Sequence, residues 1–385
     1  MRILHTSDWH LGRQFHGQEM LTHQAAFLDH LLETVEASDV DLVVVSGDIY
    51  DRALPPVDAV ELADDAFARL AASRARVVVT SGNHDSALRL GFNARLADAA
   101  GFHVRTHLDR VGEPVLLDDD HGPVAVYGIP YLDPDHAKRA WDLEHRSHHA
   151  ALGEAMRRVR ADLATRPAGT RSVVLAHAFV FGGAPTDSER DIAVGGVSAV
   201  PTALFDAIDY VALGHLHGRH TLTEAVRYSG SPLAYSFSEA HHVKGSWLID
   251  LDADGLAAST FVPAPVPRPL AQISGRLEDL LSDTRYDAVE HAWIQATLTD
   301  TVRPQQAMAR LQARFPHAVT LQFAPPTEAS SPRARRVDGR SDLAIALDFV
   351  TDVRGEPASE AESDLLRDAC EACAHDPEGD LVVSS

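Results

Sequence analysis

Short runs of apolar residues alternate with longer amphipathic stretches over the first hundred positions of the chain. The apolar runs at 2–7, 41–47 and 76–81 predict buried β-strands. The stretches between and after them have the spacing of amphipathic helices, at 21–37, 57–73 and 87–98. This alternation indicates β-α-β units around a largely parallel sheet, and therefore the α/β class.

Further strands are predicted downstream, before a change in composition. They are expected at 124–127, 172–176, 210–213, 225–229 and 245–251, with a charged helix near 146–165. Prolines then occupy every second position from Pro263 to Pro269, which is typical of an extended linker. The pattern of 270–324 is that of a small α+β domain.

The last part of the chain has two distinct segments. Residues 325–341 are rich in Pro, Ser, Arg and Gly, a composition that favours a flexible tether, and 342–375 predicts two helices around a turn at Gly355. We therefore divide the chain into domains. The expected boundaries are 1–265, 266–325, a flexible linker at 326–341, and a C-terminal helix pair with its tail at 342–385.

Composition narrows the functional classes. The 385 residues carry a formal net charge of −22, which is unusual for a protein that binds nucleic acid. No apolar run reaches the ~18–20 residues of a membrane span, and the N-terminal residues lead into a strand rather than a signal peptide. Two cysteines cannot form a disulfide framework. We therefore expect a cytoplasmic protein with no membrane association.

Five predicted strands end in residues with carboxylate, amide or imidazole side chains. These residues are Asp8, His10, Asp48, Asn83, His84, His177, His215 and His217. Because ligands of open α/β sheets lie beyond the carboxyl ends of strands, we expect these side chains to converge on one crevice. This mixture of oxygen and nitrogen donors suits two divalent cations, and one carboxylate, such as that of Asp48, can bridge them.

Each of these residues also has an ordinary structural explanation. Taken singly, Asp8, Asp48 and Asn83 are each residues that often cap a helix or form a turn. His177, taken singly, is more typical of a histidine that is hydrogen-bonded in the core. That explanation requires five strands to end in ligand-type residues by chance, so we favour the metal site. Glycines at 47, 82 and 214 support it, because they let the backbone approach the ligands closely.

The same strand ends resemble the five motifs of the calcineurin-like metallophosphoesterases. The motifs are Asp8-Trp9-His10, Gly47-Asp48-Ile49-Tyr50-Asp51, Gly82-Asn83-His84-Asp85, His177 and Gly214-His215-Leu216-His217. The segments SDWHLGR at 7–13 and GDIYDRALPP at 47–56 resemble in particular the SbcD family of bacterial nuclease subunits. RPLAQISGRLEDLL at 268–281 is similar to the start of that family's capping domain, and the terminal helix pair is similar to its tether to the SbcC ATPase.

This resemblance implies a fold and a set of residue roles. The implied fold is a metallophosphoesterase β-sandwich with flanking helices, followed by a small α+β capping domain and a C-terminal helix pair. One metal is then held by Asp8, His10, Asp48 and His217, the other by Asp48, Asn83, His177 and His215, with His84 as the catalytic residue. Two Mn²⁺ ions are expected, although the ligand types alone also admit iron or zinc. Archaeal and eukaryotic relatives carry a second active-site histidine where this chain has Asp51, to which we assign no catalytic role.

The implied function is that of a metal-dependent DNA nuclease, a double-strand exonuclease and single-strand or hairpin endonuclease, in an ATP-driven SbcCD-type complex for DNA repair, recombination and replication. A small-molecule phosphodiesterase or phosphatase shares the same motifs, and a catalytically silent scaffold of the ATPase is a further alternative. The long extension after residue 270 favours the nuclease over the first alternative. The complete set of expected ligands disfavours the second.

Charge and apolar stripes bear on the partners. Basic residues that could contact DNA, or that simply form solvated helix faces, are Arg13, Lys138, Arg139, Arg157, Arg158 and Arg160. An acidic nuclease should bind DNA weakly alone and depend on its ATPase partner.

Two apolar stripes have the spacing of helix faces. They consist of Val60, Ala63, Phe67 and Leu70, and of Leu88, Phe92 and Leu96. Each stripe is either core or, as the resemblance implies, part of a homodimer within a heterotetramer. Cys370 and Cys373 form one C-x-x-C, which we interpret as an apolar helix face rather than a zinc or redox site.

Overall fold

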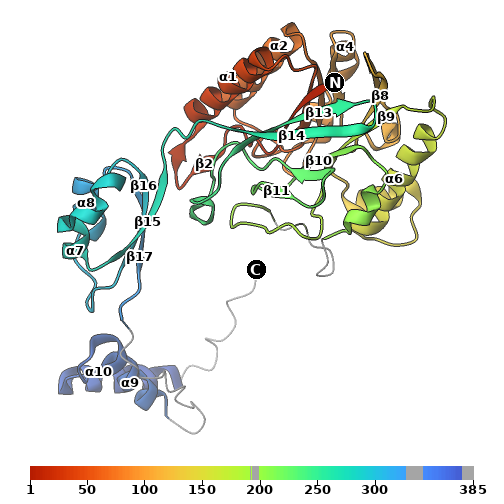
Figure 1. The fold of residues 1–385 in the computed structure, drawn as a ribbon. Coiled ribbons are helices and arrows are strands. Elements are labelled where there is room, and N and C mark those ends of the chain that lie inside the picture. The colour runs from red at the N-terminus through yellow and green to blue at the C-terminus, as the bar shows by residue number, and fades with distance from the viewer. Residues whose placement is uncertain (191, 193–198, 327–340, 375–385) are drawn as a thin grey trace. The chain divides into compact units, whose positions relative to one another are not determined.

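The computed structural model describes residues 1–190, 192, 199–326 and 341–374 (Figure 1). Residues 1–325 form one compact unit and the residues after them form another. No helix among the described residues is both long enough and apolar enough to cross a bilayer.

The first of two six-stranded sheets is built around the N-terminal strand. In spatial order its strands are β14 (Gly255–Pro263), β13 (Gly245–Asp252), β1 (Arg2–Thr6), β4 (Leu42–Ser46), β5 (Arg76–Thr80) and β6 (Phe102–Arg105). Strands β1, β4, β5 and β6 run parallel to one another. At the other edge, β13 pairs antiparallel with both β1 and β14. The sequence pattern predicts neither β6 nor β14, and β14 includes Pro263, which that pattern assigns to the linker.

The second sheet has a similar mixture of strand directions. Its order is β11 (His220–Thr221), β12 (Val226–Tyr228), β10 (Tyr210–Gly214), β9 (Arg171–His177), β8 (Gly122–Gly128) and β7 (Val115–Asp119). The four central strands are parallel, and β11 and β7 pair antiparallel at the edges. Parallel central strands place their carboxyl ends at one edge of the sheet.

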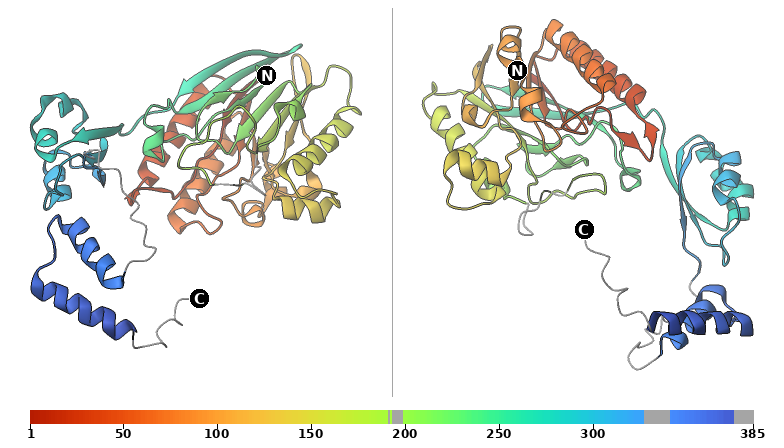
Figure 2. Two further views of the ribbon diagram at one scale, coloured as in Figure 1. Left: turned by 90° about the horizontal axis from the view of Figure 1, so that it is seen from below. Right: turned by 180° about the vertical axis from the view of Figure 1, so that it is seen from behind.

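The two sheets stack face to face and helices cover both outer faces (Figures 1 and 2). Strand β4 shows why: Leu42 and Val44 point into the core between the sheets, while Val43 and Val45 point into the core beneath the helices. The covering helices are α1 (Leu21–Ala37) and α2 (Val57–Ala72) on the first sheet, and α5 (Pro134–Trp141) and α6 (His148–Leu163) on the second. The predicted α/β class and β-sandwich are confirmed.

A small domain with its own core follows the proline-rich segment. Its elements are β15 (Leu270–Gly275), α7 (Leu277–Ser282), β16 (Trp293–Leu298), α8 (Ala307–Arg314) and β17 (Ala318–Phe323). The three strands are all parallel. Trp293 stacks on Phe15 of a two-stranded hairpin, β2 (Gln14–Phe15) and β3 (Gln18–Glu19), with ring centroids 4.8 Å apart.

The two apolar stripes have different environments. Ala63 and Leu70 on α2 are fully buried and Phe67 packs on the same core, so these three residues of the first stripe are core, whereas Val60 is 42% exposed. The predicted helix at 87–98 is wrong as one element, because Asn93 adopts φ 60° and separates two short helices. These are α3 (Ala87–Leu90) and α4 (Ala94–Asp98). Leu88, Phe92 and Leu96 are each at least 73% exposed.

The second unit contains the expected helix pair. Helix α9 (Asp342–Arg354) ends at Gly355 with φ 78°, and α10 (Glu360–Ala374) follows. Arg354 pairs with Glu362 across the turn at 2.7 Å. Most of the expected linker, the tail after 374 and the side chain of Cys373 lie outside the described residues; the side chain of Cys370 is half-buried.

Short 3-10 helices complete the description of the elements. They lie at Leu108–Arg110 (η1), Thr202–Phe205 (η2), Phe237–Glu239 (η3) and Thr284–Val289 (η4). Only η3 matters for the candidate site, because it ends at Glu239, which is fully buried.

Because Phe67 is in the core and Leu88 is exposed, replacing each with glutamate should have different effects on stability. Phe67→Glu places a carboxylate against Trp9 and Phe102, whose ring centroids lie 6.1 and 4.8 Å from that of Phe67. We expect it to lower the free energy of unfolding by about 2–4 kcal/mol in urea titrations. Leu88→Glu, at a residue that is 76% exposed in the single chain, should change the unfolding free energy of the monomer by less than ~0.5 kcal/mol. Equal destabilisation by both would contradict the assignment of core and surface.

Candidate metal centre

Five strands, three from the first sheet and two from the second, end beside one another. The residues at these ends come from β1 (Asp8, His10), β4 (Asp48), β5 (Asn83, His84), β9 (His177) and β10 (His215, His217). Both sheets contribute because the sandwich aligns the carboxyl ends of their parallel strands. All eight residues singled out in the sequence therefore lie in one cluster, linked by the contacts that follow.

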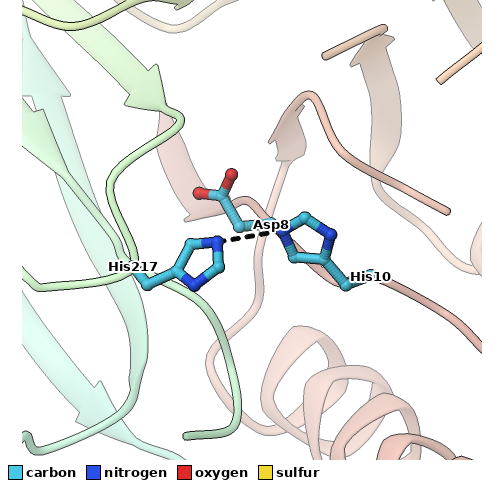
Figure 3. Close-up of side chains that lie close together, drawn as sticks. All are labelled: Asp8, His10 and His217. Carbon is cyan, nitrogen blue, oxygen red and sulfur yellow. Dashed lines mark hydrogen bonds between the residues drawn. The ribbon is translucent and has the colours of Figure 1, made fainter. Parts of the chain in front are cut away.

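One side of the cluster is formed by Asp8, His10 and His217 (Figure 3). Their ligand-type atoms lie within 4.8 Å of one another, and all three side chains are buried. His10 Nε2 lies 2.9 Å from His217 Nε2, across the gap between the two sheets. It also lies 3.6 Å from Oδ2 of Asp48. This group could hold one cation.

The other side is formed by His177, Asn83 and His215. His177 Nε2 lies 3.5 Å from Oδ2 of Asp48 and 2.8 Å from Oδ1 of Asn83. His215 Nδ1 lies 3.2 Å from the same Asn83 oxygen. The Oδ2 atom of Asp48 is thus within 3.6 Å of a histidine nitrogen on each side. Asp48 is the residue placed to bridge two cations.

The backbone at these strand ends adopts an unusual conformation. Asp8, His10, Asp48 and His215 have φ values of 54°, 48°, 50° and 105°. Such left-handed conformations cost about 1–3 kcal/mol each for residues other than glycine. Backbone bonds from Asp8 N to Gly47 O (3.1 Å) and from His10 N to Asp48 O (2.9 Å) hold two of them. Strain that recurs at four candidate ligands indicates that it serves to aim these side chains.

Two glycines are required by the closeness of the strands. Gly47 has φ 83°, and a Cβ there would collide with the imidazole of His177. A Cβ at Gly82 would collide with the carboxylate and backbone of Asp48. Any larger residue would push the candidate ligands apart.

Burial sets the ionisation of the cluster. It raises the pKa of Asp8 well above its ordinary value, an effect that the neighbouring charge of Asp48 increases. Burial likewise raises the pKa of Asp48 to about 6. It lowers the pKa of His177 to about 4, and lowers the pKa values of His10 and His215. These imidazoles are therefore neutral near pH 7, which is the form that binds metal ions.

The contacts of His177 test whether the residues fit a cation. Its Nδ1 donates to the backbone oxygen of Ser46 at 2.9 Å, so the neutral ring has a lone pair at Nε2. That lone pair faces Oδ1 of Asn83, another acceptor, and Nδ2 of Asn83 has no hydrogen-bond partner. Two acceptors 2.8 Å apart repel each other unless a positive charge lies against both. The donor set and this geometry fit divalent metal ions.

His84 stands beside this cluster with a defined orientation. Its Nδ1 donates to the backbone oxygen of Asp51 at 2.7 Å, and its backbone N–H donates to Oδ1 of Asp48 at 2.8 Å. Its Nε2 lies 3.9 Å from Oδ2 of Asp48 and so faces the cluster. Burial lowers the pKa of this imidazole. The carbonyl of Asp51 therefore orients the ring of His84, and its carboxylate lies 3.7 Å from Nδ1 of His10.

The structure adds residues that the sequence pattern did not single out. Arg190 donates to the backbone oxygen of Asn83 at 3.2 Å, and its guanidinium lies 3.4 Å from Nδ1 of His84. Ser188 and Glu189 contact His217. All three lie on a loop between strands, and the search for polar residues at strand ends could not find them. The one feature of the sequence that could have indicated them is the polar triplet Ser188-Glu189-Arg190 within a segment rich in glycine and alanine.

The basic residues proposed for DNA differ in their surroundings. Arg13 lies at the cluster, where it donates to the backbone oxygen of Ser188 at 2.6 Å. Arg157 and Arg158 instead pair with Glu154 on their own helix. Arg157 and Arg158 are therefore explained as part of a solvated helix face.

Two solved structures are distantly similar to this chain. A protein of Thermus thermophilus has 14% sequence identity and a TM-score of 0.40, with 68% of this chain and 98% of that chain covered. A dimetal phosphatase from Danio rerio has 14% identity and a TM-score of 0.37, covering 69% and 99%. At these scores the matches carry no argument about the site.

Comparison with protein families and curated proteins is more informative. A curated relative, the SbcD subunit of the SbcCD nuclease of Staphylococcus epidermidis, is 26% identical over 95% of this chain and 97% of its own length. Residues 266–353 match the type 5 capsule protein repressor C-terminal domain. Residues 1–219 match the calcineurin-like phosphoesterase profile, and this segment includes every residue of the cluster. Because that match spans more than half of the chain, the chain belongs to the calcineurin-like phosphoesterase family.

Proposed function

We propose that the chain is a metal-dependent DNA nuclease, the nuclease subunit of an SbcCD-type complex. The observation that carries this proposal is the convergence of neutral imidazoles, carboxylates and an amide on both sides of Asp48. The similarity to the staphylococcal SbcD nuclease subunit over nearly the whole of both chains supports a nucleic acid as substrate, and the resemblance of the motifs implies DNA. We expect exonuclease activity on duplex ends and endonuclease activity on single strands and hairpins.

The ligand sets follow the two sides of the cluster. We assign Asp8, His10, Asp48 and His217 to one metal, and Asp48, Asn83, His177 and His215 to the other. Mn²⁺ is the expected ion. When bound, the two cations would polarise the scissile phosphate and lower the pKa of the attacking water.

His84 supplies the proton chemistry in this proposal. The Asp51 carbonyl can only accept, so Nδ1 keeps its proton, and Nε2 gains one only when the ring is an imidazolium. An anionic phosphodiester beside the ring favours that charged form. The Nε2–H then stabilises the phosphorane or protonates the leaving oxygen.

Arg190 is the second protein group that we place at the phosphate. Its guanidinium is exposed yet close to His84, and a planar guanidinium can donate two parallel bonds to a phosphate. Arg13 holds the loop from which Arg190 projects, by its bond to the backbone oxygen of Ser188. Because acidic residues outnumber basic ones, 56 to 34, the position of a cation beside the phosphate matters more than the overall charge.

The remaining parts of the chain are assigned to assembly and DNA recognition. We propose that 1–265 is the nuclease domain, 266–325 a capping domain that contacts DNA, and 326–341 a linker. The helix pair within 342–385 would bind a coiled-coil ATPase. The exposed face with Leu88, Phe92 and Leu96 would form a homodimer within a heterotetramer.

A direct comparison of substrates tests the function. Purified protein with Mn²⁺ should cleave a labelled DNA duplex or hairpin with far higher kcat/KM than bis-p-nitrophenyl phosphate. A preference for the small diester would favour a small-molecule phosphodiesterase, and no cleavage of either would favour a scaffold.

Removing the bridging carboxylate should abolish metal binding at both sites. We expect Asp48→Ala to bind neither of the two Mn²⁺ ions in isothermal titration calorimetry and to lose all measurable hydrolysis. Asp65→Ala, at a carboxylate 60% exposed on α2, is the matched control and should behave as wild type. Two tightly bound ions in Asp48→Ala would contradict the bridging assignment.

His84→Gln should separate catalysis from metal binding. The variant should bind two metal ions with unchanged affinity, while kcat falls by ~100- to 10,000-fold because a proton donor is lost. His103→Gln, at a half-buried histidine bonded to Asp98, is the control for loss of an imidazole. If His84→Gln also lost a metal ion, His84 would be a ligand.

Truncation after Pro325 should remove partner binding without affecting the active site, because residues 1–325 form a compact unit. The truncated protein should retain Mn²⁺-dependent cleavage of single-stranded DNA within about twofold. It should no longer bind the ATPase subunit in size-exclusion chromatography, and ATP should no longer stimulate cleavage. Undiminished binding of the ATPase would show that the helix pair is not the docking element.

A further inference from the structure

His217 is held at three points by residues outside the proposed ligand sets. Its backbone N–H donates to Oε1 of Glu189 at 2.7 Å, and its backbone oxygen accepts from Nζ of Lys244 at 2.8 Å. Its ring atom Nδ1 lies 2.5 Å from the hydroxyl of Ser188. Both the main chain and the ring of His217 are therefore fixed.

The direction of the hydrogen bonds around Ser188 follows from the groups involved. The Ser188 hydroxyl also contacts Oε1 of Glu239, and a carboxylate can only accept, so Ser188 donates its single proton to Glu239. The Ser188 oxygen must then accept from His217, which places a proton on Nδ1 of the ring. The lone pair of His217 is left on Nε2, which faces Nε2 of His10 in the candidate centre (Figure 3).

A buried ion pair ends this chain of hydrogen bonds. Glu239 is 0% exposed and Lys244 is 7% exposed in their side chains, and the two form an ion pair. The three protons of the Lys244 ammonium are all used, on Glu239, the His217 carbonyl and the hydroxyl of Ser231. A buried ion pair adds little net stability, because desolvation offsets the attraction, so its retention needs another explanation.

We propose that Ser188, Glu239 and Lys244 are positioning residues that fix His217 in the tautomer presenting Nε2 to a metal ion. The proposal rests on the proposed function, since it deepens the assignment of His217 as a ligand. Lys244 keeps Glu239 charged, Glu239 orients the Ser188 hydroxyl, and Ser188 accepts the Nδ1 proton. Groups of this kind around a ligating histidine raise metal affinity by 10- to 100-fold in other proteins.

The two proposed metal sites should respond differently, which makes the proposal specific. His177 obtains the same tautomer from the backbone oxygen of Ser46, which no side-chain substitution removes. Loss of Ser188 should therefore weaken only the site that contains His217. A general loosening of the fold would weaken both sites.

The test is calorimetric titration of full-length Ser188→Ala with Mn²⁺. We expect two sites, one weakened ~10- to 100-fold and the other changed less than about twofold, in a metal-free protein that remains folded at the temperature of the titration. Ser188→Thr, which retains the hydroxyl, should restore the weakened site. Ser172→Ala is the matched control, because Ser172 is a buried serine that donates to Asp209 at 2.8 Å.

A second variant covers the case in which Ser188→Ala does not fold. Glu239→Gln combined with Lys244→Met removes both buried charges together and should weaken the same single site. The proposal is overturned if either folded variant binds both ions with wild-type affinity, or if both sites weaken equally. If wild type itself bound no Mn²⁺, the proposed function would fail, which the same titration distinguishes.

Discussion

The burial of Asp8 and Asp48 beside each other is the constraint on which the rest of this structure depends. Two carboxylates removed from water repel each other, and burial raises the pKa of both. The surrounding imidazoles are neutral and cannot balance the charge. Cations bound between the sheets would supply that balance. The strained backbone, the glycines and the alignment of the two sheets are all consistent with this one requirement.

The two sheets contribute different things to the centre. The first sheet supplies the carboxylates, His10, Asn83 and His84, whereas the second supplies three histidines, so the centre exists only when the sheets are stacked. Hydrogen bonds then orient the histidines: the backbone carbonyl of Ser46 at the end of β4 for His177, and a network of side chains from loops for His217. Rigid strands thus set the distances, and hydrogen bonds set the tautomers. A preorganised site requires both, ligands on rigid elements and hydrogen bonds that fix the orientation of each ligand.

The acidic composition and the proposed substrate are compatible because charge acts locally. A net charge of −22 repels a polyanion at long range, and salt screens that repulsion beyond ~10 Å. At the centre itself, the proposed metals and Arg190, on the loop that Arg13 holds, would present positive charge to one phosphate. Positive charge confined to the centre would orient the phosphate for cleavage but would add little to the affinity for DNA. The ATPase partner is the expected source of that affinity.

The sequence by itself determined the strands and the residues at their ends, because a period of two and a change to polar residues are local properties of the chain. Asp8, Asp48 and His177 could be found in this way. Only the tertiary structure decided which stripe is core and which is exposed, since Phe67 and Leu88 have equally apolar side chains and differ only in what packs against them. It also decided the partners of His217, because Ser188 lies 29 residues from His217 and 51 from Glu239 in the sequence, and no local pattern encodes contacts between such distant loops.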